Sequence, residues 1–258
     1  MDCKNKIIVV TGAGSGIGRA LAEEAVARGA KKVVCVDLNE AAVKQVAQKI
    51  GGLGIGADCG KEAAIAGVIE RVEKEIGPID MFIGNAGVIS RGNCDLPDSD
   101  WQLSWNVNVL QHVYVARHLI PRMVNRGGGY VVITASAAGL LNQPNSATYA
   151  TTKHAAVGLA EYLAITFGTQ GIGVSVLCPQ AVRTAMYEVG KTMGTTANVD
   201  GVVEADDAAK MTLDAVEQGR FLILTHETVL EYMRRKVSDY DRWIKGMQRL
   251  REKMSVKE

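Results

Sequence analysis

The chain has 258 residues, a formal net charge of +1 and an apolar fraction of 47%. This length is enough to bury a large core, and we expect a single domain over residues 1–258. Acidic and basic residues are interleaved, without the basic stripe that follows a phosphate backbone. Nucleic acid is therefore not an expected partner.

The five cysteines are scattered, with no C-x-x-C pair and no neighbouring histidine spacing. This pattern argues against a disulfide framework or a bound metal and suits a reducing cytoplasm. The first residues, MDCKNKIIVVTGAG, contain a four-residue apolar run, and no later apolar segment has the length of a membrane span. We expect a cytoplasmic protein without a signal peptide or membrane contact.

Short runs rich in β-branched residues alternate with helical patterns. Seven strands are predicted, at residues 6–11, 32–37, 55–59, 80–87, 130–136, 173–178 and 220–225. Helices are predicted at 18–29, 39–51 and 61–77, where apolar residues recur at spacings of three and four and a glycine ends each pattern. Apolar strands that are each followed by a helix predict an α/β fold. We expect a doubly wound, Rossmann-like parallel sheet with helices on both faces.

The glycine-rich stretch TGAGSGIG, residues 11–18, lies between the first strand and the first helix. Glycines allow a tight turn and a close approach to a pyrophosphate, which binds the free N–H groups at the helix N-terminus. Three glycines also make an ordinary strand-to-helix turn. Here, however, an acid, Asp37, ends the second strand 19 residues after Gly18, as in dinucleotide-binding motifs.

Asp37 predicts which dinucleotide binds. A carboxylate at this place can accept hydrogen bonds from both adenosine ribose hydroxyls and repels a 2′-phosphate. Neither Leu38 nor Ser15 supplies a cation. NAD is therefore favoured over NADP. Alternatively, Asp37 caps the next helix, although Asn39 is already a candidate for that role.

Tyr149 and Lys153 stand four residues apart in SATYATTKHAA, residues 146–156. On a helix their side chains share one face. The spacing alone does not distinguish a solvated surface pair from a proton-transfer device, because Tyr-x-x-x-Lys also arises by chance.

The rest of the chain decides between these readings. NAG at 85–87, NVNV at 106–109 and Ser136 at the end of the fifth strand precede the Tyr149 and Lys153 pair in that order. Together with TGxxxGxG, the set resembles the short-chain dehydrogenase/reductase family, over residues 6 to 226. The resemblance implies an NAD-dependent oxidoreductase that acts on a secondary alcohol or ketone.

The resemblance implies catalytic roles for four residues. Tyr149 would exchange a proton with the substrate oxygen, and the charge of Lys153 would lower its pKa from about 10. Lys153 would also hold the nicotinamide ribose, while Ser136 would hydrogen-bond the carbonyl or alkoxide. Asn108 would hold a water that links Lys153 to solvent. Each residue taken singly is more often a helix cap, a surface residue or a satisfied helix residue.

The same resemblance implies a set of cofactor contacts. They are Gly12, Ser15, Gly16, Ile17 and Gly18 in the glycine-rich loop, Asp37, Leu38, Asp58 and Cys59 near the adenosine, Asn85, Ala86 and Gly87, the pair Tyr149 and Lys153, and Pro179, Val182 and Thr184 around the nicotinamide carboxamide.

The chain departs from the family pattern at three places. Gln180 replaces the glycine that usually follows a proline after the sixth strand, so the family's local backbone geometry and nicotinamide packing are not assured there. Gly84 replaces an asparagine before NAG. The Asp-Gly-Gly that commonly closes the last strand is absent, and the chain continues as THETVLEYMRRKVSDYDRWIKGMQRL.

This tail, residues 229–258, is predicted to be one amphipathic helix. Its apolar residues recur at spacings of three and four: Leu230, Met233, Val237, Tyr240, Ile244 and Met247. The apolar stripe must pack against its own domain, a partner subunit or a membrane, the last disfavoured by the mixed charge. We expect it beside the substrate cleft or across a dimer.

The residues expected to face the substrate are mostly apolar and indicate a hydrophobic substrate of small to medium size. They are Val88, Ile89, Leu140, Leu141, Met186 and Tyr187. Alternatively, Arg91 or Arg183 binds an acid group.

The resemblance also implies a homodimer, or a homotetramer built from two. The subunits would meet through the helices that hold Asn108 and Tyr149, where Ala155, Ala156 and Gly158 allow close approach. Two rival functions were considered. A catalytically silent NAD-binding sensor or scaffold needs a broken tetrad, and an epimerase or dehydratase has a different glycine spacing.

Overall fold

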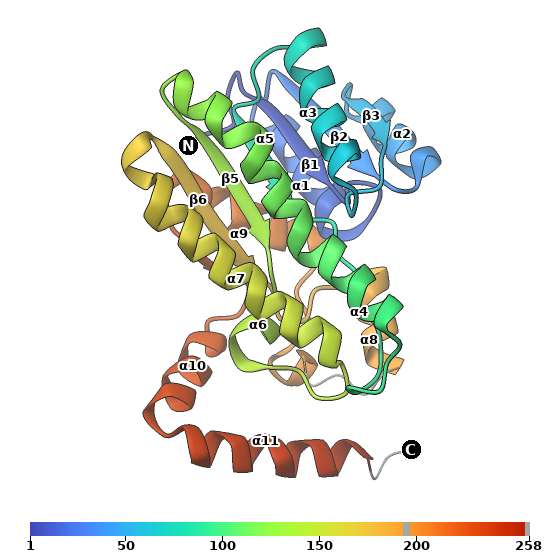
Figure 1. Cartoon of the computed structure of the whole chain (residues 1–258), viewed down its shortest axis with the longest axis vertical. Coiled ribbons are helices and arrows are strands. Elements are labelled where there is room, and N and C mark those ends of the chain that lie inside the picture. Colours follow the sequence, from blue (N-terminus) through green and yellow to red (C-terminus); the bar gives the residue numbers. More distant parts are fainter. Residues whose placement is uncertain (193–196, 256–258) are drawn as a thin grey trace.

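The computed structural model describes residues 1–192 and 197–255 and contains a seven-stranded, all-parallel sheet in the order β3-β2-β1-β4-β5-β6-β7 (Figure 1). The strands are β1 (Ile7–Thr11), β2 (Lys32–Asp37), β3 (Leu53–Gly56), β4 (Met81–Gly84), β5 (Gly129–Thr134), β6 (Ile172–Cys178) and β7 (Leu222–Leu224). The chain order reverses at β1 and β4, which confirms the doubly wound, Rossmann-like fold.

Helices cover both faces of the sheet, so most strand residues are buried (Figure 1). One face carries α3 (Glu62–Glu75), α5 (Gln111–Asn125) and α7 (Ala147–Phe167), and the other carries α1 (Gly16–Ala27), α2 (Glu40–Lys49) and α9 (Ala205–Glu217). The remaining helices are α4 (Asp98–Trp105), α6 (Ala138–Leu141), α8 (Ala185–Thr192), α10 (Thr228–Ser238) and α11 (Tyr240–Ser255), with short turns η1 (Asn106–Leu110), η2 (Gly168–Gln170) and η3 (Ala197–Asp200).

The third strand lies earlier than the sequence pattern predicted. β3 covers residues 53–56 and not 55–59, because its register is set by pairing with β2, from Val34 with Leu53 to Asp37 with Gly56. Gly54 also lies close to α2, where an added Cβ would come within 2.9 Å of the Lys44 Cα. A glycine-rich strand of this kind carries little intrinsic β preference, so packing decides its position.

The start of α2 decides between the two roles considered for Asp37. The Asn39 side chain accepts the N–H of Ala42 at 3.1 Å and caps the helix. The Asp37 carboxylate instead accepts the N–H of Gly14 at 2.9 Å and the N–H of Asn39 at 2.9 Å. Asp37 therefore joins the end of β2 to the glycine-rich loop.

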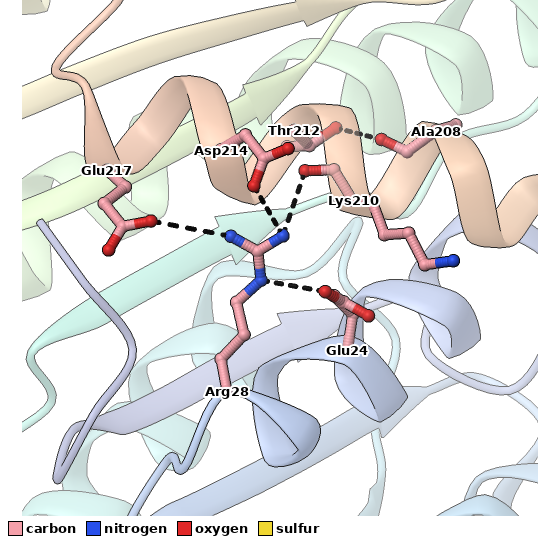
Figure 2. A network of polar contacts seen from close by, with 7 residues as sticks. All are labelled: Glu24, Arg28, Ala208, Lys210, Thr212, Asp214 and Glu217. Carbon is pink, nitrogen blue, oxygen red and sulfur yellow. Dashed lines mark hydrogen bonds and ion pairs between the residues drawn. The ribbon is translucent and has the colours of Figure 1, made fainter.

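The contact between α1 and α9 has a polar edge centred on Arg28 (Figure 2). The guanidinium lies 2.8 Å from Glu24, 2.7 Å from Asp214 and 3.7 Å from Glu217, and it donates to the Lys210 carbonyl at 3.3 Å. Asp214 and Glu217 are more than half exposed, so these pairs contribute little each. They orient two helices whose apolar contacts supply the stability.

The tail forms two helices, and the prediction of a single helix is wrong. α10 ends at Ser238, and Asp239 has an extended backbone with φ −156° and ψ 93°. The Asp239 carboxylate accepts the N–H of Arg242 at 2.9 Å, which is a capping bond for a new helix. An aspartate inside the apolar repeat therefore restarts the helix in a new direction.

The first tail helix is anchored to the body of the protein. Val229 is fully buried in the core cluster of the α3, α5 and α7 face, and Met233 packs against the same cluster. Lys236 donates to the Leu140 carbonyl at 2.6 Å, which joins α10 to α6. In Figure 1, α11 runs along the lower edge of the molecule and connects to the body through α10. Residues 256–258 of the predicted tail lie outside the described residues.

Part of the subunit contact expected on α7 is not at the surface. Ala156 is fully buried in the core and cannot meet a second subunit, whereas Gly158 is exposed. Tyr162 and Ile165 on the same helix are 59% and 80% exposed, which leaves an apolar surface there. Within the described part of the chain, no helix is both long and apolar enough to cross a membrane.

Two deletions distinguish the roles of the tail helices. Removing residues 228–258 should lower Tm by roughly 4 to 8 °C, because burial of Val229 contributes about 2 kcal/mol to the free energy of unfolding. Removing residues 240–258 should leave Tm nearly unchanged, because α10 and its core contacts stay. Differential scanning calorimetry measures both. An equal loss of Tm in the two deletions would contradict this assignment.

Candidate active site

Three adjoining hollows lie at the carboxyl ends of the strands, where open α/β sheets bind ligands. The glycine-loop cleft, about 500 Å³, lies beside Gly12, Asp37 and Lys153. The Tyr149 pocket, about 110 Å³, shares Tyr149 with that cleft. The tail cavity, about 780 Å³, shares Ser136 with the Tyr149 pocket and extends to α11. The three hollows therefore adjoin one another, from the glycine loop to the tail.

The glycine-rich loop has the backbone that a bound dinucleotide requires. Gly12 and Gly16 have positive φ values of 65° and 54°. A Cβ on Gly18 would lie 2.1 Å from the Gly12 carbonyl oxygen, so Gly18 lets α1 begin directly against the loop. A Cβ on Gly14 would lie 2.9 Å from the Asp37 carboxylate. The loop is thus shaped for close backbone approach.

Most of the predicted cofactor contacts line the glycine-loop cleft. They are Gly12, Ser15, Gly16, Ile17, Asp37, Leu38, Asp58, Cys59, Asn85, Ala86, Gly87, Tyr149, Lys153, Pro179 and Thr184. Gly18 is not among the lining residues, because it is buried in the contact between loop and helix. Val182 lines the Tyr149 pocket instead. The lining also includes Leu103 and Val107, which were not predicted. Their spacing of four residues, which puts two side chains on one face of a helix, was the sequence signal that could have identified them.

Thr11 is a positioning residue that sequence reasoning missed. Its hydroxyl accepts the N–H of Asn85 at 2.9 Å and the N–H of Ala86 at 3.0 Å, and its carbonyl accepts from the Asn85 side chain at 3.1 Å. The threonine that opens TGAGSGIG therefore fixes the NAG segment beside the glycine loop. Its place at the head of the glycine-rich motif was the signal.

The glycine at position 84 is explained by a buried histidine. A Cβ on Gly84 would lie 2.5 Å from Nδ1 of His112, which is 2% exposed on α5. Burial lowers the pKa of His112 to about 3, with a smaller contribution from the charge of Lys153, so the ring is neutral. His112 thus occupies the space that a side chain at position 84 would fill.

Asn108 lies in the π-helical turn η1, a form of backbone that often occurs at functional sites. Its side chain accepts the N–H of Val88 at 2.9 Å and donates to the Val88 carbonyl at 3.0 Å and to the Thr152 hydroxyl at 3.0 Å. These bonds fix the chain after NAG against α7, next to Lys153. The water expected at Asn108 stays a prediction.

Lys153 is a buried cation beside Tyr149. Its side chain donates to the Thr134 carbonyl at 2.8 Å and lies 5.6 Å from the centroid of the Tyr149 ring. The residue is 2% exposed, and burial lowers its pKa to about 8. The surroundings therefore reduce the preference of this ammonium for its charged form.

In this structure the pKa of Tyr149 lies above its usual value, and Lys153 is not among the groups that shift it. Burial raises the pKa of the phenol above its usual value, a hydrogen bond with Ser136 lowers it in part, and the Cys178 thiolate would raise it further. Loss of solvent around the phenolate is the larger effect. At neutral pH the phenol is thus protonated and can donate a hydrogen bond.

Ser136 stands where β5 has ended and α6 is about to begin. Its hydroxyl accepts the N–H of Ala138 at 3.1 Å and lies 3.4 Å from the Pro179 carbonyl. The side chain lines both the Tyr149 pocket and the tail cavity. A carbonyl oxygen in this pocket would meet two hydroxyl donors, from Ser136 and Tyr149.

Gln180 does not have a positive φ, so its backbone conformation is one that a residue with a side chain adopts without strain. Its effect on nicotinamide packing stays a prediction. Its N–H donates to the Thr225 hydroxyl at 3.1 Å, and its side-chain amide donates to Asp200 at 2.8 Å. The same carboxylate accepts from the Tyr232 hydroxyl of α10 at 3.0 Å. The substitution of the usual glycine therefore adds a polar link between the loop after β6 and the tail.

The residues expected to face the substrate divide among the hollows. Ile89, Met186 and Tyr187 line the Tyr149 pocket, Leu141 the tail cavity and Val88 the glycine-loop cleft. Leu140 is 9% exposed and packs in the core instead.

The two candidate acid-binding arginines lie elsewhere. Among the described residues, Arg91 and Arg183 line none of these three hollows, and Arg183 pairs with Glu204 at 2.7 Å. The described residues also contain no group of three or more His, Cys, Asp or Glu side chains that could hold a metal ion.

Comparison with known proteins identifies the family suggested by the sequence motifs. The family model described as short chain dehydrogenase matches residues 6–193. A CLA biosynthesis dehydrogenase/reductase from Lactiplantibacillus plantarum is 30% identical over 257 residues, covering 87% of this chain and 89% of that protein. Epidermal retinol dehydrogenase 2 from Mus musculus is 31% identical over 223 residues, covering 83% of this chain and 71% of that protein.

A solved structure extends the likeness to three dimensions. A short chain dehydrogenase/reductase from Burkholderia phymatum, in complex with NAD, has a TM-score of 0.85 and 28% sequence identity. The match covers 93% of this chain and 96% of that chain.

The contact between position 84 and His112 can be tested by a double-mutant cycle. Gly84→Asn alone should lower the free energy of unfolding by about 1 to 3 kcal/mol, because the side chain overlaps the imidazole. In the His112→Ala background the same substitution should cost much less, since the space is then free. Urea denaturation measures each variant. Strictly additive losses would show that the two residues do not compete for space.

Proposed function

Because the chain belongs to the short-chain dehydrogenase/reductase family, we propose that it is an NAD-dependent oxidoreductase that interconverts a secondary alcohol and its ketone. The main support is the placement of Tyr149, Lys153 and Ser136 where the glycine-loop cleft meets the Tyr149 pocket. A cofactor in the first hollow and a substrate in the second would then be adjacent.

The residues of the cleft fit a dinucleotide. The backbone of Gly12 and Gly16 would approach the pyrophosphate, and Asp37 would accept hydrogen bonds from the adenosine ribose. At the other end Lys153 would bind the nicotinamide ribose. When bound, the nicotinamide supplies the hydride acceptor or donor, and the protein orients it.

The protein side chains handle the proton and the substrate oxygen. In ketone reduction, the Tyr149 hydroxyl would give its proton to the carbonyl oxygen, and in alcohol oxidation the phenolate would take it back. Ser136 would donate a hydrogen bond to the same oxygen and stabilise negative charge on it. The raised pKa of Tyr149 keeps the phenol in the donor form before the reaction.

Charge favours NAD over NADP in this proposal. The Asp37 carboxylate lines the adenosine end of the cleft, and Leu38 beside it is 75% exposed. Of the described residues that line the cleft, Lys153 is the cation, and it lies at the catalytic end. A 2′-phosphate near Asp37 would therefore meet a negative charge without a compensating positive one.

The substrate proposed here is hydrophobic. Ile89, Val182 and Met186 line the Tyr149 pocket, and its volume of about 110 Å³ admits the reacting end of a molecule rather than a large body. The retinol dehydrogenase among the relatives supports an apolar substrate by its name. A cytoplasmic homodimer, or a tetramer of two such dimers, and a single domain over residues 1–258 belong to the same proposal. The exposed Tyr162 and Ile165 on α7 offer a surface for the subunit contact.

The proposed reaction depends on the Tyr149 hydroxyl. Tyr149→Phe should lower kcat by about 10²- to 10⁴-fold, because it removes the proton donor and keeps the ring. NAD affinity should change by no more than a few-fold. A panel of secondary alcohols and ketones, followed by the absorbance of reduced nicotinamide, measures turnover with NAD and NADP in parallel. Tyr162→Phe on the same helix is the matched control. More than a tenth of the wild-type rate in Tyr149→Phe would count against this role.

The proposed cofactor preference depends on Asp37. Asp37→Ser should raise KM for NAD by about 10- to 100-fold, because it removes charged hydrogen bonds to the ribose. It should raise kcat/KM for NADP at the same time, since repulsion of the 2′-phosphate is relieved. Steady-state kinetics with both cofactors gives the ratio. Equal use of NAD and NADP by the wild-type enzyme would show that Asp37 does not select the cofactor.

A further inference from the structure

The tail cavity is the largest of the three hollows and has two unlike walls. The body contributes Ser136, Pro179 and Gln180, at the carboxyl ends of β5 and β6. The opposite wall is formed by the tail, chiefly by α11. A molecule whose reacting end lies beside Ser136 could therefore extend into a space bounded by the tail. The volume of about 780 Å³ is in the range of sites for organic ligands.

One face of α11 lines this cavity, and it has two parallel strips. Trp243, Met247 and Leu250 are partly buried and form an apolar strip at spacings of four and three. Arg242, Arg249 and Lys253 recur at spacings of seven and four, and they line the same cavity beside the apolar strip. We call these three residues the cationic strip. It extends over about 16 Å of helix.

The cationic strip is not neutralised by neighbouring carboxylates. In the part of the chain that the structure describes, its three residues form no ion pair, whereas Arg235 of the cavity lining is paired with Glu231. Asp239 also lines the cavity, and its carboxylate caps α11 at the N–H of Arg242. Residues 228–255 contain eight Lys and Arg against four Asp and Glu, although the whole chain is nearly neutral. Positive charge is thus concentrated in the tail, and Arg242, Arg249 and Lys253 bring part of it to this wall.

We propose that the tail cavity binds the distal part of the substrate, and that this part is an apolar chain ending in an anionic group, a carboxylate or a phosphate. The chain would lie on Trp243, Met247 and Leu250, and the anion would bind the cationic strip. This inference rests on the proposed function, because it places the reacting carbonyl beside Ser136 and Tyr149. It replaces Arg91 and Arg183 as the source of acid recognition and enlarges the substrate beyond the small Tyr149 pocket.

The direction of the apolar strip favours a substrate over a lipid surface. A helix that binds a membrane turns its apolar side away from the protein. In α11 the apolar strip lines a cavity that faces the catalytic edge, whereas the exposed residues on its other sides are mostly polar, such as Lys245, Gln248 and Glu252, with Tyr240 and Ile244 as the exposed apolar ones. Ser136, Pro179 and Gln180 line both the tail cavity and the Tyr149 pocket, so the two hollows adjoin, and in this proposal one molecule occupies both.

The test compares charged and uncharged forms of one probe on the full-length protein. The probes are carboxylates with a secondary alcohol at the penultimate carbon, from 5-hydroxyhexanoate to 15-hydroxyhexadecanoate, their methyl esters, and the corresponding terminal phosphates. Isothermal titration calorimetry measures binding with and without NAD, and nicotinamide absorbance measures turnover. A member of the acid or phosphate series should bind about tenfold more tightly than its uncharged ester, and added salt should reduce this difference.

Two double variants locate the binding site. Arg242→Gln with Arg249→Gln should raise Kd and KM for the anionic probe about tenfold, and it should leave kcat and the values for the ester unchanged. Arg234→Gln with Lys245→Gln removes the same charge from tail positions that do not line the cavity. This control variant should leave Kd, KM and kcat unchanged for both the anionic probe and the ester. Preference for phosphate over carboxylate, or the reverse, identifies the anion, and either result supports the proposal if it is lost in the first double variant.

Four results would overturn the inference. The first two are equal binding of acid and ester, and equal losses in the two double variants. The third is that the Arg242→Gln and Arg249→Gln double variant loses only binding to anionic phospholipid vesicles. The fourth is that this double variant changes oligomeric state in light scattering, because the strip would then belong to a subunit contact. If the proposed function were wrong, the experiments would give a different result from these. An anionic probe would then bind through Arg242 and Arg249, but no alcohol or ketone would be turned over by protein that binds NAD.

Discussion

The constraint on which the rest depends is the burial of the parallel sheet on both faces. β1, β4, β5 and β6 are almost completely enclosed by helices, so a polar side chain within them, such as that of Ser175, must be hydrogen-bonded internally. The other polar groups gather where the strands end, and parallel strands all end at the same edge. Thr11 at the end of β1, the NAG segment after β4 and Ser136 after β5 are therefore brought together by the sheet itself. The hydrogen bonds of Thr11 to Asn85 and Ala86 then fix the spacing at that edge.

The same burial sets the chemistry of the Tyr149 and Lys153 pair. Both groups lie in a region that disfavours charge, so the pKa of Lys153 falls to about 8 and that of Tyr149 rises. The ammonium of Lys153 is held by the Thr134 carbonyl, and the phenol of Tyr149 stays protonated beside Ser136. In the proposed reaction, binding and hydride transfer would have to supply the charges that make this phenol exchange its proton.

Two of the three departures from the family pattern are each matched by a second residue. Gly84 leaves the space that His112 fills, and Gln180 binds the Asp200 carboxylate that also holds Tyr232 of the tail. Gln180 and the unusual tail are thus parts of one arrangement, because the side chain at 180 helps to join the catalytic edge to α10. In the further proposal, that connection places α11 and its cationic strip opposite Ser136.

The sequence by itself determined the sheet, the glycine loop, the role of Asn39 as a cap and the set of residues at the carboxyl edge, because these follow from local periodicity and from motifs that stand next to strand ends. The position of β3 could not be read from a glycine-rich run, since its pairing with β2 sets the register. The tail was predicted as one helix, because a single capping aspartate weighs little against a long apolar repeat. Ala156 was expected at a subunit contact and Leu140 beside the substrate, and both proved to be buried in the core. Only the tertiary structure decided the pKa of Tyr149 and the wall to which Arg242, Arg249 and Lys253 belong. Both depend on desolvation and on neighbours far apart in sequence, which no local pattern records.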